Sequence, residues 1–468
     1  MLPDEVLLAI FGFCVVPAAK DQNTKKGIEA WQSLVHVCRR WRSIVFGSPR
    51  HLNLRLVSTD KTSVRDLLDV WPLLPLVIHG YLSEDADFSN IVAALEHRDR
   101  VHEIQLQPVY SPAMEEVLAV MQEPFPELTD LQLLSDGEEV DEMAPVIPDS
   151  FLGGSAPRLR FLWLDEIPFP GLPNLLLSAT HLVNLRLSNI THFGYILPDA
   201  MVIALSALTS LDSLLLDFQS SRSHLGWPIR RPLPSSRFVL PVLTHFSFNG
   251  DCEYFNDFVA RIGAPRLHHL SISFFNGIVF DAPQFIQFIG RTPTPKPLEN
   301  AHVDFEEREA RINFYSGSSR TSSDRSLEVG TSCWELYEQV SFLELVCASC
   351  SSFLSTLENL YIHEGLIFSY LHRQNNLDNM LWLDLLRSFT TVKNLYLSKR
   401  IARRIVPALQ ELVEERTTEV LPVLQNIFLE KLEPSEPVFE DIQQFVAMRQ
   451  AAGHPIAVSS WEKDSTFF

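Results

Sequence analysis

The chain has 468 residues, of which 46% are hydrophobic, so wholesale disorder is excluded and a long repeat array or several domains can be built. A formal net charge of −20 excludes nucleic acid as the main partner, because phosphate binding requires a basic face. Residues 1–60 nevertheless hold eight Lys or Arg against five Asp or Glu. This basic start on an acidic body either suits an acidic partner or reflects solvated arginines.

Two short helices are predicted within residues 2–45, on either side of a polar loop at 15–30. Both segments place apolar side chains at the spacing of one helix face. These side chains are Val6, Leu7, Ile10, Phe11 and Cys14 in the first segment and Leu34, Val37, Cys38, Trp41 and Ile44 in the second. Helices of this length bury little apolar surface on their own, so we expect a partner to cover part of it.

The apolar run at 6–19 imitates a signal-peptide core, but Asp4 and Glu5 stand where such a peptide carries positive charge. The run is also too short to cross a bilayer, and no membrane partner is expected. Six scattered cysteines favour an intracellular protein of the cytoplasm or nucleus. Cys347 and Cys350 form a lone C-x-x-C whose spacing to other ligands suits zinc poorly, so we expect buried thiols, with no metal and no cofactor.

A leucine pattern, L-x-x-L-x-L, recurs along the chain at spacings of 23 to 35 residues, apart from one step of 59. Copies begin at Leu128, Leu159, Leu182, Leu211, Leu243, Leu267, Leu298, Leu357, Val392 and Leu424, with weaker ones at Leu73 and Val101. Each copy reads as a strand, and the intervening segments mostly read as helices. The pattern predicts an α/β fold: an irregular leucine-rich-repeat solenoid with a parallel inner sheet and outer helices.

The chain is therefore divided into a helical module at 1–50, a solenoid at 51–458 and a tail at 459–468. The ends of the sheet need cover, and we expect 51–56 to open it and 453–458 to close it.

A Ser-rich segment at 315–326 interrupts the array, and the stretch before it, 310–314, alternates like a strand. This segment is either a long hairpin loop on the edge of the solenoid or a phosphorylatable regulatory loop. The unusually long step between repeats also contains a hidden strand candidate at 327–329.

Residues between the leucines of each repeat are expected to project from the concave face of the sheet. The candidate partner-binding residues there are Trp163, Tyr361, Tyr396 and Phe428, of which the last three should stack on neighbouring strands. The alternative is that helices or the tail cover them as ordinary core. A neighbouring row of five asparagines, Asn184, Asn300, Asn359, Asn394 and Asn426, is expected to form a structural amide ladder rather than a binding code.

The N-terminal sequence contains Leu2-Pro3-Asp4-Glu5-Val6-Leu7 and Ile10-Phe11, followed by Val37-Cys38-Arg39-Arg40-Trp41. With these residues it resembles the F-box motif. With the repeats and the C-terminal helix and H-P-I-x-V strand, the chain is similar to F-box/leucine-rich-repeat proteins of basidiomycete fungi. This resemblance implies a substrate-recognition subunit of an SCF-type cullin-RING ubiquitin ligase, which binds the Skp adaptor, through it a cullin, and an unknown protein substrate. The implied adaptor-binding residues are Leu2, Pro3, Val6, Leu7, Ile10, Phe11, Leu34, Val37, Cys38 and Trp41.

The sequence departs from these families in two places. The turn asparagine of regular leucine-rich repeats is missing, and the loop at 15–30 is inserted between the two F-box segments. A leucine-rich scaffold whose F-box-like helices only cap the solenoid is therefore the alternative function. No catalytic motif of the metalloprotease, P-loop, dinucleotide-binding or serine-hydrolase kind is present, so no enzyme activity and no catalytic residue are expected.

Overall fold

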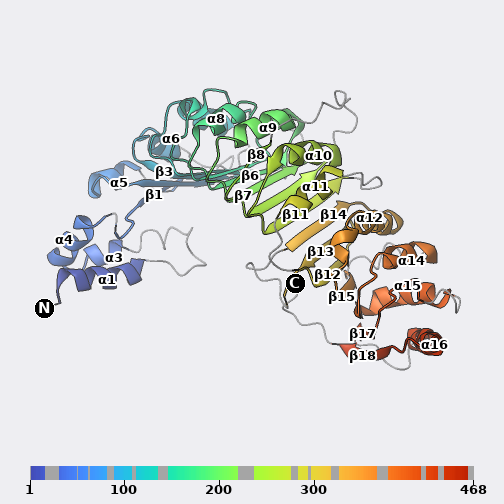
Figure 1. The fold of residues 1–468 in the computed structure, drawn as a ribbon. Coiled ribbons are helices and arrows are strands. Elements are labelled where there is room, and N and C mark those ends of the chain that lie inside the picture. The colour runs from blue at the N-terminus through green and yellow to red at the C-terminus, as the bar shows by residue number, and fades with distance from the viewer. Residues whose placement is uncertain are drawn as a thin grey trace. The chain divides into compact units, whose positions relative to one another are not determined.

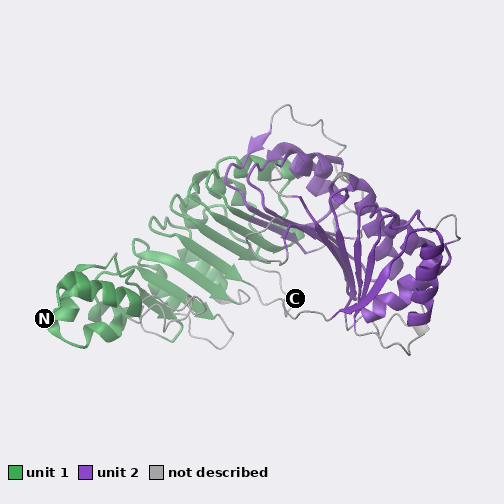
Figure 2. Cartoon of the chain, turned by 60° about the horizontal axis from the view of Figure 1, so that its bottom comes forward, with its two compact units in different colours: residues 1–213 green, residues 214–468 purple. Residues whose placement is uncertain are grey.

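The chain forms two compact units, residues 1–213 and residues 214–468, in a computed structural model (Figure 2). The described residues are 2–15, 31–49, 51–61, 64–81, 89–107, 112–134, 146–219, 237–275, 283–292, 297–317, 326–365, 378–412, 418–430 and 437–461. Within these ranges, every helix is too short or too polar to cross a lipid bilayer.

Unit 1 begins with the helical module, made of α1 (Asp4–Val15), α3 (Gln32–Val35) and α4 (Arg39–Gly47), at the blue end of the ribbon in Figure 1. α4 packs against both α1 and α3. The buried side chains of the module are Leu7, Phe11, Trp31, Leu34, Val35 and Val45. The inserted loop at 16–30 lies outside the described residues, so its effect on the module stays a prediction.

The remainder of unit 1 is a parallel sheet with its strands in chain order. The strands are β1 (Leu56–Thr59), β2 (Leu76–Tyr81), β3 (Val101–Gln107), β4 (Asp130–Leu134), β5 (Phe161–Asp165) and β6 (Asn184–Ile190). Helices and short 3-10 turns connect them: α5 (Val64–Val70), α6 (Ser89–Leu95), α7 (Pro112–Val120), η1 (Phe151–Gly154), α8 (Leu172–Ser178), η2 (His192–Gly194) and α9 (Pro198–Leu205). The predicted strand–helix repeat is thus confirmed here.

Unit 2 continues the same kind of array from β7 (Ser213–Phe218). Its further strands are β9 (His245–Gly250), β11 (His269–Phe275), β12 (Asn300–Phe305), β13 (Glu309–Tyr315), β14 (Ser326–Ser332), β15 (Asn359–Glu364), β16 (Asn394–Leu397), β17 (Asn426–Glu430) and β18 (Ala457–Trp461). Its helices are α10 (Cys252–Arg261), α11 (Pro283–Arg291), α12 (Leu336–Ser349), α13 (Ser351–Leu354), α14 (Asn379–Arg387), α15 (Lys399–Gln410) and α16 (Pro437–Ala451). A separate pair, β8 (Phe238–Val239) and β10 (Ile262–Gly263), runs parallel.

One strand breaks the parallel order. β13 lies inside the sheet between β14 and β12 and runs antiparallel to both. The strand predicted at 310–314 therefore exists, and its antiparallel pairing with β14 agrees with the interpretation of the Ser-rich segment between them as a hairpin loop. The expectation of a parallel sheet is wrong for this one strand. Only residues 306–308 connect β12 to β13, and so short a turn joins neighbouring strands only when they are antiparallel.

The hidden strand at 327–329 is confirmed as β14, which pairs in parallel with β11. The Ser-rich loop connects β13 to β14, and its residues 318–325 lie outside the described part of the chain. Whether this loop is regulatory stays a prediction.

The end strands are displaced from their predicted positions. β1 begins at Leu56, where the predicted opening strand ends, and β18 occupies 457–461 rather than 453–458. β18 pairs with β17 through Trp461, so the tail boundary predicted at 459 falls inside a strand. Gly453, which follows the end of α16, has a positive φ of 83°. It belongs to the turn that ends the helix, so the strand starts only after it.

The leucine positions of the repeats form the core between sheet and helices. Alternate strand residues are buried, as in β5, β6, β15 and β16, and their partners on the other side are half-exposed. Phe305 of β12 shows the arrangement, since its ring packs edge-on against Trp382 of α14 at 5.5 Å between centroids. We call the opposite side of the sheet, which carries the half-exposed residues, the open face.

Candidate functional site

The first helix carries two apolar stripes in different surroundings. Leu7 and Phe11, one turn apart, are buried in the helical module. A second stripe is exposed and consists of Leu2, Val6, Ile10 and Phe13. Val6, Ile10 and Phe13 are three or four residues apart, which places them along one side of α1, and Leu2 lies two residues before the helix starts at Asp4. Sequence reasoning missed Phe13, although its spacing from Ile10 was the available signal.

The other residues predicted to bind the adaptor are divided in the same way. Leu34 is buried, and Trp41 is half-buried with its ring centroid 4.7 Å from that of Phe11. Pro3, Val37 and Cys38 are exposed. The backbone N–H of Trp41 donates to the sulfur of Cys38 at 3.5 Å, so this cysteine caps the start of α4. The predicted set thus contains both surface residues and residues that hold the helices together.

Two arginines of the basic start act inside the module. The Arg40 guanidinium donates to the Asp4 carboxylate and to the carbonyl of Leu2, each at 2.5 Å. Arg42 Nε donates to the carbonyl of Val35 at 3.0 Å. Arg40 therefore ties the start of α1 to α4, and neither arginine is merely a solvated charge.

Trp31 joins the helical module to the sheet of unit 1. Its side chain is fully buried, and its indole N–H donates to the carbonyl of Arg55, just before β1, at 3.0 Å. Its ring packs edge-on against Trp71, which follows α5, at 5.1 Å, and Phe46 of α4 lies 6.4 Å from the same Trp71. The module is therefore attached to the residue directly before β1 and to the segment that follows α5.

Three aromatic side chains form a stacked row on the open face of unit 2. The ring centroids of Tyr361 and Tyr396 are 4.2 Å apart, and those of Tyr396 and Phe428 are 4.4 Å apart, with near-parallel planes. The three residues are paired in register on β15, β16 and β17. The predicted stacking is present, and all three side chains are half-exposed. We call Tyr361, Tyr396 and Phe428 the aromatic row.

Trp461 of β18 packs against one side of the aromatic row. Its ring meets Tyr396 and Tyr361 edge-on at 5.6 and 6.2 Å, and its indole N–H donates to the carbonyl of Leu397 at 3.5 Å. Burial is the main cause that raises the pKa of Tyr361, and the neighbouring Tyr396 adds to it. The row is therefore neither fully open nor ordinary core. The contact of Trp461 with Tyr396 could not be predicted from the sequence, because it depends on the order of β16, β17 and β18 in the sheet.

The asparagine row forms a ladder of amide hydrogen bonds beside the aromatic row. Each Nδ2 donates to the Oδ1 of the preceding asparagine: Asn359 to Asn300 at 2.9 Å, Asn394 to Asn359 at 2.8 Å, and Asn426 to Asn394 at 2.7 Å. Asn300 in turn donates to the carbonyl of Gly317 at 2.7 Å. These four amides bond to one another, as a structural ladder requires. The fifth asparagine predicted in the row, Asn184, lies on β6 of unit 1, where it accepts from Arg186 Nε instead.

The fourth predicted partner-binding residue, Trp163, belongs to unit 1 and so is not part of the aromatic row. It lies half-exposed on β5, and its indole N–H donates to Ser188 Oγ on β6 at 3.1 Å. Arg186, paired with it in register, lies with its guanidinium 5.5 Å from the Trp163 ring.

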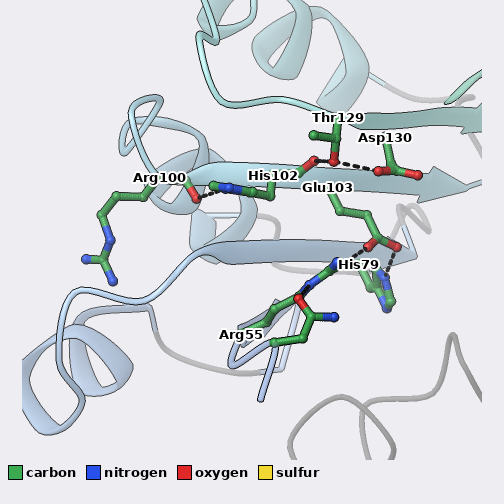
Figure 3. Close-up of polar contacts among 8 residues, drawn as sticks. Arg55, His79, Arg100, His102, Glu103, Thr129 and Asp130 are labelled. Carbon is green, nitrogen blue, oxygen red and sulfur yellow. Dashed lines mark hydrogen bonds and ion pairs between the residues drawn. The ribbon is translucent and has the colours of Figure 1, made fainter. Parts of the chain in front are cut away.

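A charge cluster that sequence reasoning missed lies on the first strands of unit 1 (Figure 3). Glu103 of β3 accepts from Arg55 Nη1 at 2.9 Å and lies 3.4 Å from His79 Nε2. Burial alone would raise the pKa of Glu103, but the hydrogen bond and charge of His79, together with Arg55, outweigh it and lower this pKa. The three residues are separated by 24 and 48 positions in the chain, so no local pattern reveals them.

Asp130 of β4 pairs in register with Glu103, and its charge is less well compensated than that of Glu103. Thr129 Oγ1 donates to its carboxylate at 2.5 Å. Burial raises the pKa of Asp130, and the charge of Glu103 raises it further, against the opposing effects of Thr129, Arg55 and Arg160. The negative charge of Asp130 is therefore disfavoured in the folded chain.

Asp130→Asn is expected to stabilise unit 1 at neutral pH. A raised pKa means that the fold favours the protonated carboxyl, so its stabilising contribution is full below the ordinary value of 3.8 and is lost as pH rises through the folded value. Solvent screens this half-exposed group, so the gain should stay below about 1 kcal/mol. Thermal unfolding of variant and parent from acidic to neutral pH should show a difference only toward neutral pH.

Glu103→Gln is the matched control, with the opposite sign. The pKa of Glu103 in the parent chain is lowered, so its carboxylate stabilises the fold at pH values above the ordinary pKa of glutamate, and this stabilisation is lost as pH falls through the folded pKa. Glu103→Gln should therefore destabilise unit 1 at neutral pH. An Asp130→Asn variant that is less stable than the parent at neutral pH would contradict the conclusion that the negative charge of Asp130 is disfavoured in the folded chain.

The three cysteines in and around α12 have the properties of buried thiols. Cys333, Cys347 and Cys350 are free and buried. Burial raises the pKa of Cys350 to about 12 and that of Cys347 well above its ordinary value. Among the described residues, no three His, Cys, Asp or Glu side chains gather as a metal site.

Comparison with known proteins yields little. No family model matches the chain, and no curated protein matches it. Among solved structures, the chain is similar to the leucine-rich repeat-containing protein LegL7 from Legionella pneumophila, at 12% identity and a TM-score of 0.24, over 84% of this chain and 97% of that chain. So slight a likeness carries no argument about function, and the fold rests on the strand–helix array itself.

Proposed function

We propose that this chain is the substrate-recognition subunit of an SCF-type ubiquitin ligase. The helical module binds the Skp adaptor and through it a cullin, and the open face of the array holds a protein target. The observation that carries this proposal is the exposed apolar stripe of α1, formed by Leu2, Val6, Ile10 and Phe13. Contiguous exposed apolar residues mark interaction surfaces.

Within this proposal, the predicted adaptor-binding residues have two roles. Leu2, Pro3, Val6, Ile10, Val37 and Cys38 are exposed and contact the adaptor directly. Leu7, Phe11 and Leu34 are buried, with Trp41 half-buried beside them, and these residues position the helices that carry the contact residues.

The array supplies the second half of the function. Its strands are paired in register, so the open face is a firm surface, and the aromatic row offers the kind of side chains that dominate protein interfaces. A target held there is kept near the ligase at high effective concentration, which requires no catalysis by this chain. The acidic net charge of −20 argues against nucleic acid as the target.

The alternative is a scaffold whose helical module only caps the array. The contacts of Trp31 with Arg55 and Trp71 favour this alternative, because they attach the module to the residue directly before β1. A helical module that only caps the array, however, does not require the exposed apolar stripe of α1. Both readings can hold together, since the buried and exposed stripes of α1 lie on different sides.

Adaptor binding tests the proposal. The intact chain should bind a purified Skp-type adaptor in calorimetry, and Val6→Asp with Ile10→Asp should weaken binding at least about 100-fold, because two charges would be buried at the interface. Val70→Asp with Leu73→Asp is the control, since both residues are exposed apolar positions of unit 1 outside the module. A parent chain that does not bind, or a Val6/Ile10 variant that binds as tightly as the parent, would leave the cap as the function.

A further inference from the structure

Arg186 is held against two aromatic rings on the open face of unit 1. Its guanidinium carbon lies 5.5 Å from the centroid of Trp163 and 5.8 Å from that of Phe161, both on the neighbouring strand β5. The Nε atom donates to Asn184 Oδ1 at 3.3 Å, and the Trp163 ring is fixed by its hydrogen bond to Ser188. The planar cation is therefore positioned before any ligand arrives.

This guanidinium has no carboxylate partner among the described residues, where its polar contact is the one to Asn184. That is notable in a chain with 58 acidic and 38 basic residues. Arg55 and Arg404 are paired with Glu103 and Glu364, whereas Arg100 and Arg449 donate to backbone carbonyls. The two terminal nitrogens of Arg186 thus remain available, in the fork geometry that suits a carboxylate.

Charges of both signs surround the aromatic pair in a fixed order. Asp130 on β4 pairs in register with Phe161 on β5, and Trp163 pairs with Arg186 on β6. Adjacent strands are about 4.8 Å apart, and Arg186 lies two residues further along β6 than Asn184, the register partner of Phe161, so the acidic and basic positions are separated by roughly 12 Å with the rings between them. This spacing matches three to four residues of an extended peptide, each of which advances about 3.3 Å.

We propose that Arg186, Trp163 and Phe161 form a receptor for an acidic side chain of an extended peptide in the target. The carboxylate pairs with the Arg186 guanidinium, and an apolar neighbour of the acidic residue packs on the exposed part of Trp163. A phosphate is disfavoured, because a dianion would meet the nearby Asp130 and Glu103 and the acidic net charge. The inference names the target class for the proposed recognition subunit, and so rests on that function.

The test uses the intact chain and immobilised dodecapeptides of neutral Ser, Gly and Leu residues. One central position is varied among Asp, Glu, Asn, Gln, Lys and phosphoserine. The parent chain should bind Asp and Glu peptides about tenfold better than their Asn and Gln counterparts, the advantage of a charge-assisted pair. Arg186→Lys should lose most of this preference, and Arg186→Glu should reverse it toward Lys.

Arg266→Glu is the matched control, because it makes the same change in net charge at an exposed position outside unit 1. It should leave the preference unchanged, and circular dichroism should show all variants folded. Equal binding of Asp and Asn peptides, a preference insensitive to Arg186→Glu, or stronger binding of phosphoserine than of Glu would overturn the receptor. None of these results involves the adaptor, so they remain separable from a failure of the ligase proposal.

Discussion

Phe11→Ala is expected to destabilise the helical module by about 3–5 kcal/mol, the usual effect of removing a fully buried phenylalanine. The Phe11 side chain is 0% exposed and packs on Trp41 of α4, so alanine leaves a cavity between the two helices. A chain of two units does not unfold in one step, so amide hydrogen exchange in α1 and α4 is the appropriate measurement. Exchange of these amides should become much faster.

Phe13→Ala is the control for this experiment, on the same helix and with the same chemical change. Its side chain is 87% exposed, so hydrogen exchange should shift by less than about 0.5 kcal/mol. Adaptor affinity should nevertheless fall in the Phe13 variant, because this residue belongs to the exposed stripe. Equal destabilisation by the two substitutions would show that the two stripes are not distinct.

Tyr361→Ala with Tyr396→Ala is expected to abolish target binding while the chain stays folded. The two rings stack at 4.2 Å but are half-exposed, so the loss of stability should be only about 2 kcal/mol, from the stack and the edge contacts of Trp461. Affinity purification of the tagged parent identifies the target, and direct binding of that target to purified variants then provides the measurement.

Tyr337→Ala, at an exposed position of α12 in the same unit, should leave target binding intact. The two outcomes that count against the aromatic row are different in kind. A double variant that loses its secondary structure would assign the two tyrosines to the core, and one that binds the target normally would move the binding site elsewhere.

The strands and helices were accessible from the sequence because each repeat is a local signal. The spacing of Leu360 and Ile362 predicts a strand whatever its neighbours are, and both residues lie in β15. The same local signal placed Tyr361, Tyr396 and Phe428 on one face of adjacent strands. β13 could not be placed in this way, because its alternation predicts a strand but contains nothing about which neighbours it joins.

The roles and contacts of the site residues could not be predicted from the sequence for the same physical reason. The motif at the N-terminus identifies which residues matter to the module, but burial decides their roles, and Ile10 and Phe11 differ in burial although they are adjacent. The contacts of Glu103 with Arg55 and of Trp461 with Tyr396 join distant parts of the chain. Such contacts follow from the order and register of strands, which periodicity does not specify.

The antiparallel β13 also has a kinetic consequence. In a simple array each repeat can add to the one before it, so folding spreads by short steps. Here β11 must pair with β14, 57 residues away, and β12 with β15, 59 residues away. We expect growth of the sheet to be slowest at these two pairings, because each closes a loop about twice as long as an ordinary repeat, whereas the β12–β13–β14 meander itself joins strands that are close in the chain.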